Sequence, residues 1–275
     1  MMDVAHPEIA DAVRRALEED IGPGDVTSEA CVPADREASG QFIAREPQVI
    51  AGIELLPLIY DQCVLHKRSG DRAAAGEVIA EVQGNARALL SCERVALNFL
   101  QRLGGVATLA SRYVERVAGT GCRVLDTRKT TPGLRRLEKM AAAAGGVTNH
   151  RMGLYDAILI KNNHIEAAGG VRAAIEAARS SSKLPIEIEV RTREELAEAL
   201  ETGAAHLLLD NFTPAEAADL VRLIAGRAKV EISGGVTLEN VRAYAETGAD
   251  YVSAGAITHS AAAVDVSFRL MWNML

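Results

Sequence analysis

Basic side chains gather in one part of this otherwise acidic chain. The formal net charge of the sequence is −7 at pH 7, yet only Asp126, Glu138 and Asp156 carry negative charge between Asp126 and His164. Cations placed beside turns and strand ends are typical of a site for a small, highly anionic ligand. The basic residues of this stretch are Arg128, Lys129, Arg135, Arg136, Lys139, Arg151 and Lys161, together with His150 and His164.

Lys161 directly follows the apolar run Ala157–Ile160, and polar residues come after it. A lysine in this position can bind an anion as a point charge or form a Schiff base. We favour anion binding over the Schiff base, and an exposed lysine at a strand end is the alternative without function. His150 and Arg151 lie in a loop after two glycines, where an arginine suits bidentate recognition of a carboxylate or phosphate.

Two carboxylates follow later apolar runs. Glu189 lies in the run Ile186–Val190, whose alternation puts Glu187 on the same face, and both faces of a parallel strand are normally covered. Asp210 ends the next run and can bind ribose hydroxyls, bind a metal or stabilise a nearby positive charge. A cap of the following helix is the structural alternative for Asp210.

Small residues follow the last two apolar runs. They let backbone N–H groups approach a phosphate, and the last two loops of an α/β barrel often bind phosphate in this way. Ordinary turns before helices are the alternative. His259 comes just after the second turn, within reach of such a phosphate. The residues concerned are Ser233, Gly234 and Gly235 in the first turn, and Ala254 and Gly255 in the second.

Short apolar runs alternate with helical patterns after Gly121, which predicts a parallel sheet of about six strands. An incomplete α/β barrel and an open doubly wound sheet both fit this count. In either fold, ligands bind at the carboxyl ends of the strands, where the polar residues named above fall. The predicted strands are 122–126, 157–160, 186–190, 206–209, 230–233 and 251–254, and the predicted helices are 171–179, 193–201, 214–224 and 238–246.

The chain before Gly104 and Gly105 has a mixed character. Strand-like runs broken by glycines are expected within 39–51 and 64–82. Ser91 is a plausible N-cap for an amphipathic helix through Leu103, and the same pattern makes Arg94 a polar residue with a structural role. Further helices are expected over 7–19 and 53–63.

Composition excludes several classes of protein. The acidic total argues against a nucleic-acid binder, and no apolar run approaches the roughly 18 residues of a membrane span. The N-terminus lacks the pattern of a signal peptide. The four cysteines are scattered without a CxxC pair, so we expect no zinc ribbon or redox motif and a reduced, cytoplasmic protein.

Long motifs resemble the quinolinate phosphoribosyltransferases, also called nicotinate-nucleotide pyrophosphorylases (carboxylating). The resemblance covers nearly the whole chain, and its clearest segments are 126–133, 146–156 and 158–165, with further matches over 19–28, 93–103 and 251–260. It implies an N-terminal α/β sandwich domain over 1–105, completed by 264–275. It also implies an incomplete, six-strand α/β barrel over 106–263, of the type II phosphoribosyltransferase kind.

The resemblance also implies a role for each matching residue. Arg128, His150 and Arg151 bind the two quinolinate carboxylates, and Arg94 reaches the same site from the partner subunit, which reverses the structural interpretation. Lys129 and Lys161 lie between the two substrates. Glu189 and Asp210 bind the ribose hydroxyls and belong to an indirect Mg²⁺ network. The 5′-phosphate is bound by Ser233, Gly234, Gly235, Ala254, Gly255 and His259.

The implied reaction is de novo NAD biosynthesis: phosphoribosyl transfer from 5-phosphoribosyl 1-pyrophosphate (PRPP) to quinolinate with loss of CO₂. The implied cofactor is Mg²⁺. The implied assembly is a homodimer with shared active sites, and a hexamer is a further possibility. Neither nucleic acid nor membrane is an expected partner. Asn162 and Gly104 depart from the family pattern, and Asn162 alters the field on Lys161. The alternatives are a nicotinate-using or molybdenum-locus relative, a Schiff-base aldolase or isomerase using Lys161, and a non-catalytic phosphate binder.

Overall fold

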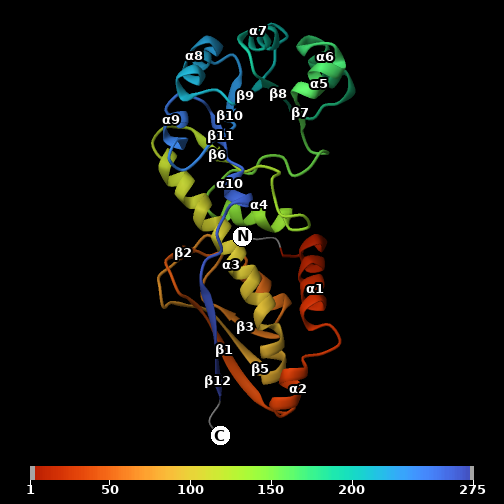
Figure 1. The fold of residues 1–275 in the computed structure, drawn as a ribbon, viewed down its shortest axis with the longest axis vertical. Coiled ribbons are helices and arrows are strands. Elements are labelled where there is room, and N and C mark those ends of the chain that lie inside the picture. Colours follow the sequence, from red (N-terminus) through yellow and green to blue (C-terminus); the bar gives the residue numbers. More distant parts are fainter. Residues whose placement is uncertain (1–3, 273–275) are drawn as a thin grey trace. The chain divides into compact units, whose positions relative to one another are not determined.

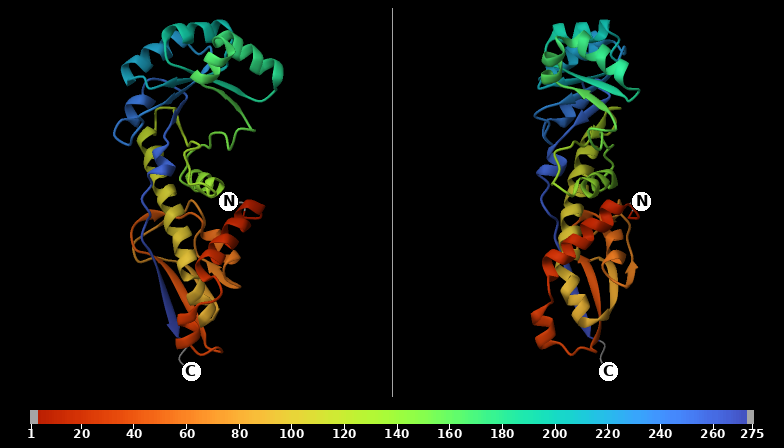
Figure 2. Two further views of the ribbon diagram at one scale, coloured as in Figure 1. Left: turned by 45° about the vertical axis from the view of Figure 1, so that its right-hand side comes forward. Right: turned by 90° about the vertical axis from the view of Figure 1, so that its right-hand side faces the viewer.

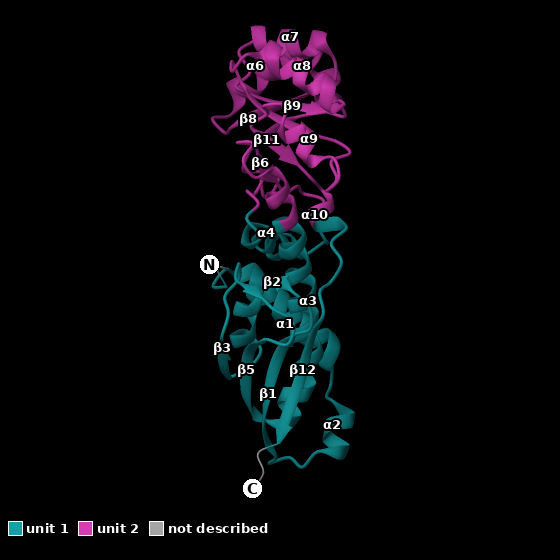
Figure 3. Cartoon of the chain, turned by 90° about the vertical axis from the view of Figure 1, so that its left-hand side faces the viewer, with its two compact units in different colours: residues 1–111, 130–146, 258–275 teal, residues 112–129, 147–257 magenta. Residues whose placement is uncertain are grey.

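The computed structural model describes residues 4–272, which divide into two compact units (Figure 3). Unit 1 consists of the residues up to 111, residues 130–146 and the residues from 258 onward. Unit 2 consists of residues 112–129 and 147–257. The chain therefore crosses between the units four times. The two domain ranges expected from the sequence, 1–105 with 264–275 and 106–263, stay a prediction.

An antiparallel sheet organises unit 1. Its strand order is β12-β1-β5-β3, so the last strand of the chain pairs with the first, from Ala38 opposite Trp272 to Ala44 opposite Val266. Burial alternates along β1 because successive side chains point to opposite faces. Residues 273–275 of the predicted C-terminal segment lie outside the described residues. The strands of unit 1 are β1 (Glu37–Ala44), β2 (Gln48–Val49), β3 (Gln62–Leu65), β4 (Arg72–Ala73), β5 (Val78–Asn85) and β12 (Val266–Trp272).

Helices accompany this sheet and help to enclose its aliphatic core. The first part of α3 contributes Ala96, Leu97 and Leu100 to the core cluster, against Phe42 and Ile79 of the sheet. These elements are α1 (Pro7–Ile21), α2 (Val26–Cys31), the 3₁₀ helix η1 (Ile53–Leu58), α3 (Ala86–Val117), of which residues 112–117 belong to unit 2, and α4 (Arg135–Ala144).

Two helix predictions in unit 1 were wrong in extent. The helix expected over 53–63 is a 3₁₀ helix that ends at Leu58, and Cys63 lies in β3. Pro57 has no backbone N–H to donate and disfavours a regular α-helix there. The helix expected to open at Ser91 begins at Ala86, because the Asn85 side chain already accepts the N–H of Arg87 at 3.1 Å. Ser91 instead lies inside α3.

Gly104 and Gly105 do not end α3, which runs through both. They serve a close approach of the returning chain. A Cβ on Gly105 would lie 2.0 Å from the carbonyl oxygen of Ala262, and one on Gly104 would lie 2.8 Å from Cγ2 of Val264. The glycine pair therefore reflects packing between two segments of unit 1 rather than a chain break.

A six-stranded parallel sheet forms the centre of unit 2. Its order is β6-β11-β10-β9-β8-β7, so consecutive strands from β7 to β11 are neighbours and β6 returns beside the last of them. This single winding, left open between β6 and β7, is that of an incomplete barrel and differs from a doubly wound sheet. The strands are β6 (Arg123–Leu125), β7 (Ile158–Ile160), β8 (Ile186–Val190), β9 (His206–Asp210), β10 (Lys229–Ser233) and β11 (Tyr251–Ser253).

Helices α6, α7 and α8 lie along the outer face of this curved sheet (Figures 1 and 2). All six predicted strands are present, and the structure confirms the α/β class with an incomplete six-strand barrel and a separate antiparallel domain. No helix in the described residues is long and apolar enough to cross a membrane. The helices of unit 2 are α5 (Asn162–Ala168), α6 (Val171–Ser181), α7 (Arg193–Glu201), α8 (Pro214–Ile224) and α9 (Val241–Ala245), and α10 (Ala256–His259) follows with its last two residues in unit 1.

Candidate active site

A cavity of about 490 Å³ lies in unit 2 at the carboxyl ends of the parallel strands. The strands themselves explain its polar walls, since Glu189 lies in β8 and Asp210 and Ser233 end β9 and β10. Carboxyl ends of neighbouring parallel strands meet at one edge of the sheet. Ten residues predicted from the sequence line this cavity: Arg128, Lys129, His150, Arg151, Lys161, Glu189, Asp210, Ser233, Gly234 and Gly235.

Two arginines of the cavity wall, Arg128 and Arg151, influence each other through their charges. Burial and the nearby charge of Arg128 lower the pKa of Arg151. One nitrogen of Arg151 is fixed by the carbonyl oxygen of Ala157 at 3.0 Å. Two like charges held in a partly buried wall repel each other, and a bound anion relieves that repulsion. The arrangement therefore favours an anionic ligand at this wall.

The loop that carries His150 and Arg151 is anchored by Asp126, which is fully buried after β6. One Asp126 oxygen accepts the backbone N–H of His150 at 2.8 Å, and the other accepts the side-chain amide of Asn149 at 2.6 Å. A carboxylate in this position fixes the loop by charge-assisted hydrogen bonds. Asp126, which the sequence showed only as an acid among bases, therefore has a structural role.

The two predicted carboxylates of the cavity share one cationic neighbour. Arg191, one residue beyond β8, donates to Glu189 Oε1 at 2.9 Å and lies 3.4 Å from Asp210 Oδ2. Asn211 also donates to Asp210 Oδ2, at 2.8 Å. These contacts neutralise part of the negative charge and hold both carboxylates at the cavity. Oxygen donors of this kind suit Mg²⁺, although the guanidinium already occupies one oxygen of each pair.

The backbone conformation and close packing at position 234 require a glycine. The φ of Gly234 is +92°, and a Cβ there would lie 2.2 Å from Oδ1 of Asn211. Asn211 itself has a positive φ of 63°. Because glycine alone adopts such a conformation without strain and lets the two loops approach, the turn after β10 keeps its backbone at the cavity wall.

A buried ionisable cluster lies beneath the cavity, inside the barrel. The Nε2 atom of His150 lies 3.1 Å from Glu187 Oε2 and 3.4 Å from Glu231 Oε2. On the far side of Glu187, His206 Nε2 lies 3.4 Å from the other carboxylate oxygen, Oε1. We refer to His150, Glu187, Glu231 and His206 as the inner cluster. Glu187 and Glu231 are nearly inaccessible to solvent, so their charges are poorly solvated.

The inner cluster retains protons strongly. Burial opposes a charge on His150, but the hydrogen bonds and charges of Glu187 and Glu231 outweigh it and raise the pKa of His150 to about 10. Burial, together with the charge of Glu187, raises the pKa of Glu231. Burial also opposes the charge of Glu187, but the hydrogen bond from His150 and the charge of His206 lower its pKa. Glu187 is therefore the anionic member of the cluster.

The raised pKa makes His150 a cation at neutral pH, and one imidazolium balances only one of the two buried carboxylates. Glu231 is the more deeply buried of the two, and its pKa is raised. Glu231 is therefore the neutral carboxylic acid of the cluster, beside ionised Glu187.

Four predicted residues do not line the cavity. Ala254 is buried and donates its N–H to the carbonyl oxygen of Leu125 at 3.2 Å, and Gly255 follows it in unit 2. Arg94 is exposed on α3, and His259 is exposed in α10. Both of these residues belong to unit 1. Their predicted roles stay predictions.

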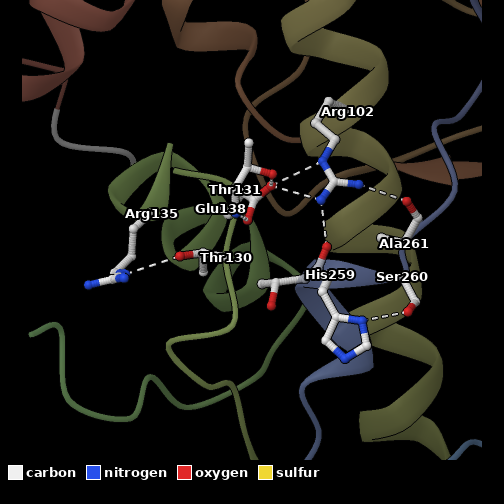
Figure 4. A network of polar contacts seen from close by, with 9 residues as sticks. Arg102, Thr130, Thr131, Arg135, Glu138, His259, Ser260 and Ala261 are labelled. Atoms are coloured by element: carbon white, nitrogen blue, oxygen red, sulfur yellow. Dashed lines mark hydrogen bonds and ion pairs between the residues drawn. The ribbon is translucent and has the colours of Figure 1, made fainter. Parts of the chain in front are cut away.

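Within unit 1, a polar network surrounds the end of α10 (Figure 4). Glu138 of α4 is completely buried and accepts the N–H of Thr131 at 3.0 Å and its hydroxyl at 2.7 Å. Arg102 of α3 donates to Glu138 at 2.8 Å and to the carbonyl oxygen of Ala261 at 2.7 Å. The His259 ring lies 2.6 Å from the hydroxyl of Ser260. The network fixes the segments that follow Lys129 and precede β12.

Several polar residues of unit 2 escaped the sequence reasoning, and three of them are ionisable groups that contact one another or a predicted residue. Glu231 lines the cavity, His206 belongs to the inner cluster, and Arg191 binds Glu189. A signal for Glu231 was present, because a carboxylate inside a short strand of a parallel sheet is unusual. His206 and Arg191 lie at the first residue of a strand and just beyond one, where polar residues are common.

Comparisons with known proteins agree over most of the chain. Residues 106–269 match the family described as "Quinolinate phosphoribosyl transferase, C-terminal domain", and residues 25–104 match its N-terminal domain. A Mycobacterium leprae protein named nicotinate-nucleotide pyrophosphorylase (carboxylating) is 41% identical, over 94% of this chain and 96% of its own.

A Nicotiana glauca protein named quinolinate phosphoribosyltransferase (decarboxylating) 2, mitochondrial, is 39% identical, over 97% of this chain and 84% of its own. Among solved structures, NadC from Streptococcus pyogenes superposes with a TM-score of 0.91 at 37% identity, covering 96% of this chain and 97% of that one. The sequence motifs, the fold and these relatives agree: the chain belongs to the quinolinate phosphoribosyltransferase family.

Proposed function

We propose that the residues lining the cavity of unit 2 catalyse the transfer of the phosphoribosyl group from PRPP to quinolinate, with release of CO₂. The chain is a decarboxylating quinolinate phosphoribosyltransferase, which forms nicotinate mononucleotide and pyrophosphate in NAD biosynthesis. One observation carries the assignment: four cations and two carboxylates, Arg128, Lys129, Arg151, Lys161, Glu189 and Asp210, line one cavity at the strand ends.

The cations suit the two substrates. Quinolinate carries two carboxylates, and we assign these to the wall formed by Arg128 and Arg151, beside which His150 lines the cavity. The mutual repulsion of the two guanidiniums is relieved by a dianion, which makes binding selective for it. Lys129 and Lys161 then lie between quinolinate and PRPP, where each meets negative charge from both.

The carboxylates suit the transferring sugar. As the bond from C1 of the ribose to pyrophosphate breaks, C1 gains positive charge, which Glu189 and Asp210 stabilise electrostatically. Arg191 holds both carboxylates in place for that role. The backbone of Ser233 and Gly234 is our proposed 5′-phosphate site, with Gly235 beside it. Asn211 packs closely against Gly234, where a larger residue would not fit.

Mg²⁺ fits this site as an ion that enters with the pyrophosphate of PRPP. Glu189 and Asp210 offer oxygen donors, but Arg191 already neutralises them, so we assign them an indirect role through water and the ribose hydroxyls rather than direct coordination. When bound, Mg²⁺ supplies charge neutralisation of the departing pyrophosphate.

The assembly is a further proposal. All residues that line the cavity belong to unit 2, whereas Arg94 is exposed on α3 in unit 1. We propose that Arg94 serves the cavity of a second copy of the chain in a homodimer. An Arg94→Ala variant then loses activity and regains about a quarter of it when mixed with an inactive Lys161→Ala variant, because one site per mixed dimer is intact. No recovery on mixing contradicts the shared site.

A product assay tests the proposed function. We expect the protein, with Mg²⁺ and PRPP, to convert quinolinate to nicotinate mononucleotide and CO₂. In a parallel reaction we expect no product from nicotinate, which lacks the second carboxylate. Turnover of nicotinate alone would refute the assignment of Arg128 and Arg151, and no product from either would refute the function.

A further inference from the structure

The inner cluster lies between two separate cavities of unit 2. A second cavity of about 330 Å³ contains the first residues of four strands, among them His206 and Tyr251, and so opens at the amino ends of the sheet. His150, Arg151 and Glu231 line both this cavity and the catalytic one. The ionisable groups thus form the partition between two cavities at opposite ends of the barrel.

Stability does not explain this cluster. The interior of a small parallel barrel is usually filled by branched aliphatic side chains, and two buried carboxylates cost free energy that their partners recover only in part.

The reaction needs a proton that neither substrate supplies at carbon. The bond between ring atom C2 and its carboxylate breaks, CO₂ leaves, and the electron pair stays on C2 beside the cationic ring nitrogen. A new C2–H bond must take that pair together with one proton. A neutral carboxylic acid that lines the catalytic cavity is a suitable donor.

We propose that the inner cluster delivers this proton: Glu231 protonates C2 after CO₂ has left, and His206 and Glu187 restore the proton from the second cavity. The inference rests on the proposed function. After the transfer, Glu231 is a carboxylate beside ionised Glu187, and the repulsion between two buried charges drives the uptake of a proton from water. His206 Nε2 and Glu187 Oε1 lie 3.4 Å apart without a hydrogen bond, so a small rotation of the imidazole completes the path.

Groups from every neighbouring element set the charge of this path. His150 follows β6, Glu187 belongs to β8, His206 to β9 and Glu231 to β10. The other polar or charged groups around the cluster are Asp126 at the His150 backbone, Arg151 at its ring, Arg128 beside Arg151, Ser253 of β11 at Glu231, Asp250 near His206, and Tyr251, whose ring lies 5.6 Å from that of His206.

Glu231→Gln is the first test, because glutamine has the shape of the neutral acid but no acidic proton. In single turnovers with quinolinate, we expect pyrophosphate release to stay within threefold of the wild type. Formation of nicotinate mononucleotide should fall by about 10²–10⁴, the usual contribution of a general acid, and the carboxylated nucleotide should accumulate. An equal fall in pyrophosphate and mononucleotide, or a fall in neither, overturns the proposal.

His206→Ala tests whether His206 returns the proton to Glu231, since His206 does not itself line the catalytic cavity. We expect kcat to fall roughly tenfold with both KM values unchanged, and added imidazole to restore it, because the second cavity admits that base. His66→Ala removes an exposed histidine of unit 1 that lies 3.3 Å from Glu81, and it is the matched control, with wild-type kcat. A wild-type rate in His206→Ala, or a loss that imidazole does not restore, overturns the relay.

The two proposals fail differently. If the wild-type protein makes no nicotinate mononucleotide, the proposed function fails. If the wild type turns over while Glu231→Gln and His206→Ala keep its product ratio and rate, only the proton relay fails.

Discussion

Replacing Arg151 with alanine should weaken quinolinate binding selectively. In the structure one guanidinium nitrogen of Arg151 is held by Ala157, and the group lies close enough to Arg128 for their charges to repel. A charged hydrogen bond contributes about 1.5–3 kcal/mol, and a carboxylate bound in bidentate fashion gains two of them. Removing Arg151 also removes its repulsion of Arg128, which offsets part of the loss.

The net loss for Arg151→Ala is then about 2–3 kcal/mol, or roughly 30- to 150-fold in the quinolinate KM. The KM for PRPP should change less than threefold. Steady-state kinetics at varied quinolinate and saturating PRPP measure the effect. Arg172→Ala is the matched control and should behave as the wild type. Arg172 is an exposed arginine on α6, 3.7 Å from Glu201. A quinolinate KM within threefold of the wild type would remove Arg151 from carboxylate binding.

Three further substitutions test the framework. Glu138→Ala leaves Arg102 without its buried partner and should lower the free energy of unfolding by about 3–5 kcal/mol in urea titrations; a loss below 1 kcal/mol contradicts the network. Gly234→Ala should cost about 1–3 kcal/mol of strain and raise the PRPP KM at least tenfold, and an unchanged KM argues against the phosphate site. Hydrogen bonds from the hydroxyl and N–H of Ser28 and from Ser91 lower the pKa of Asp25 from 3.8 to about 2. The ionised Asp25 side chain therefore stabilises the folded protein fully above pH 4, and this stabilisation is lost as the pH falls through 2. The difference in unfolding free energy between wild type and Asp25→Ala should therefore shrink between pH 4 and 2, and a difference that is constant over that range counts against these hydrogen bonds.

The alternation of short apolar runs with helical patterns predicted the parallel sheet well, because β-strands such as Ile186–Val190 are short and sharply bounded. It could not choose between barrel and open sheet. That choice depends on β6 pairing with β11, a contact between residues far apart in the chain. Helix α3 was predicted too short because Gly104 and Gly105, which usually break helices, are there to admit the returning chain.

The cavity was predicted more completely than the groups beneath it. Lys161, Glu189 and Asp210 stand at strand ends, so the rule that parallel strands end at one edge places them together. The inner cluster depends instead on side chains at different heights of the barrel, such as Glu231 and His206, which a linear pattern does not align. The contact of Arg191 with Glu189 and Asp210 is likewise set by loop geometry.

The carbon lost from quinolinate tests the central claim most directly. Quinolinate labelled in its 2-carboxylate, incubated with the protein, Mg²⁺ and PRPP, should release one labelled CO₂ for each pyrophosphate formed. Quinolinate labelled in the 3-carboxylate should keep its label in nicotinate mononucleotide. Pyrophosphate without labelled CO₂, or label lost from the 3-position, would contradict a site that binds both carboxylates and removes the one beside the ring nitrogen.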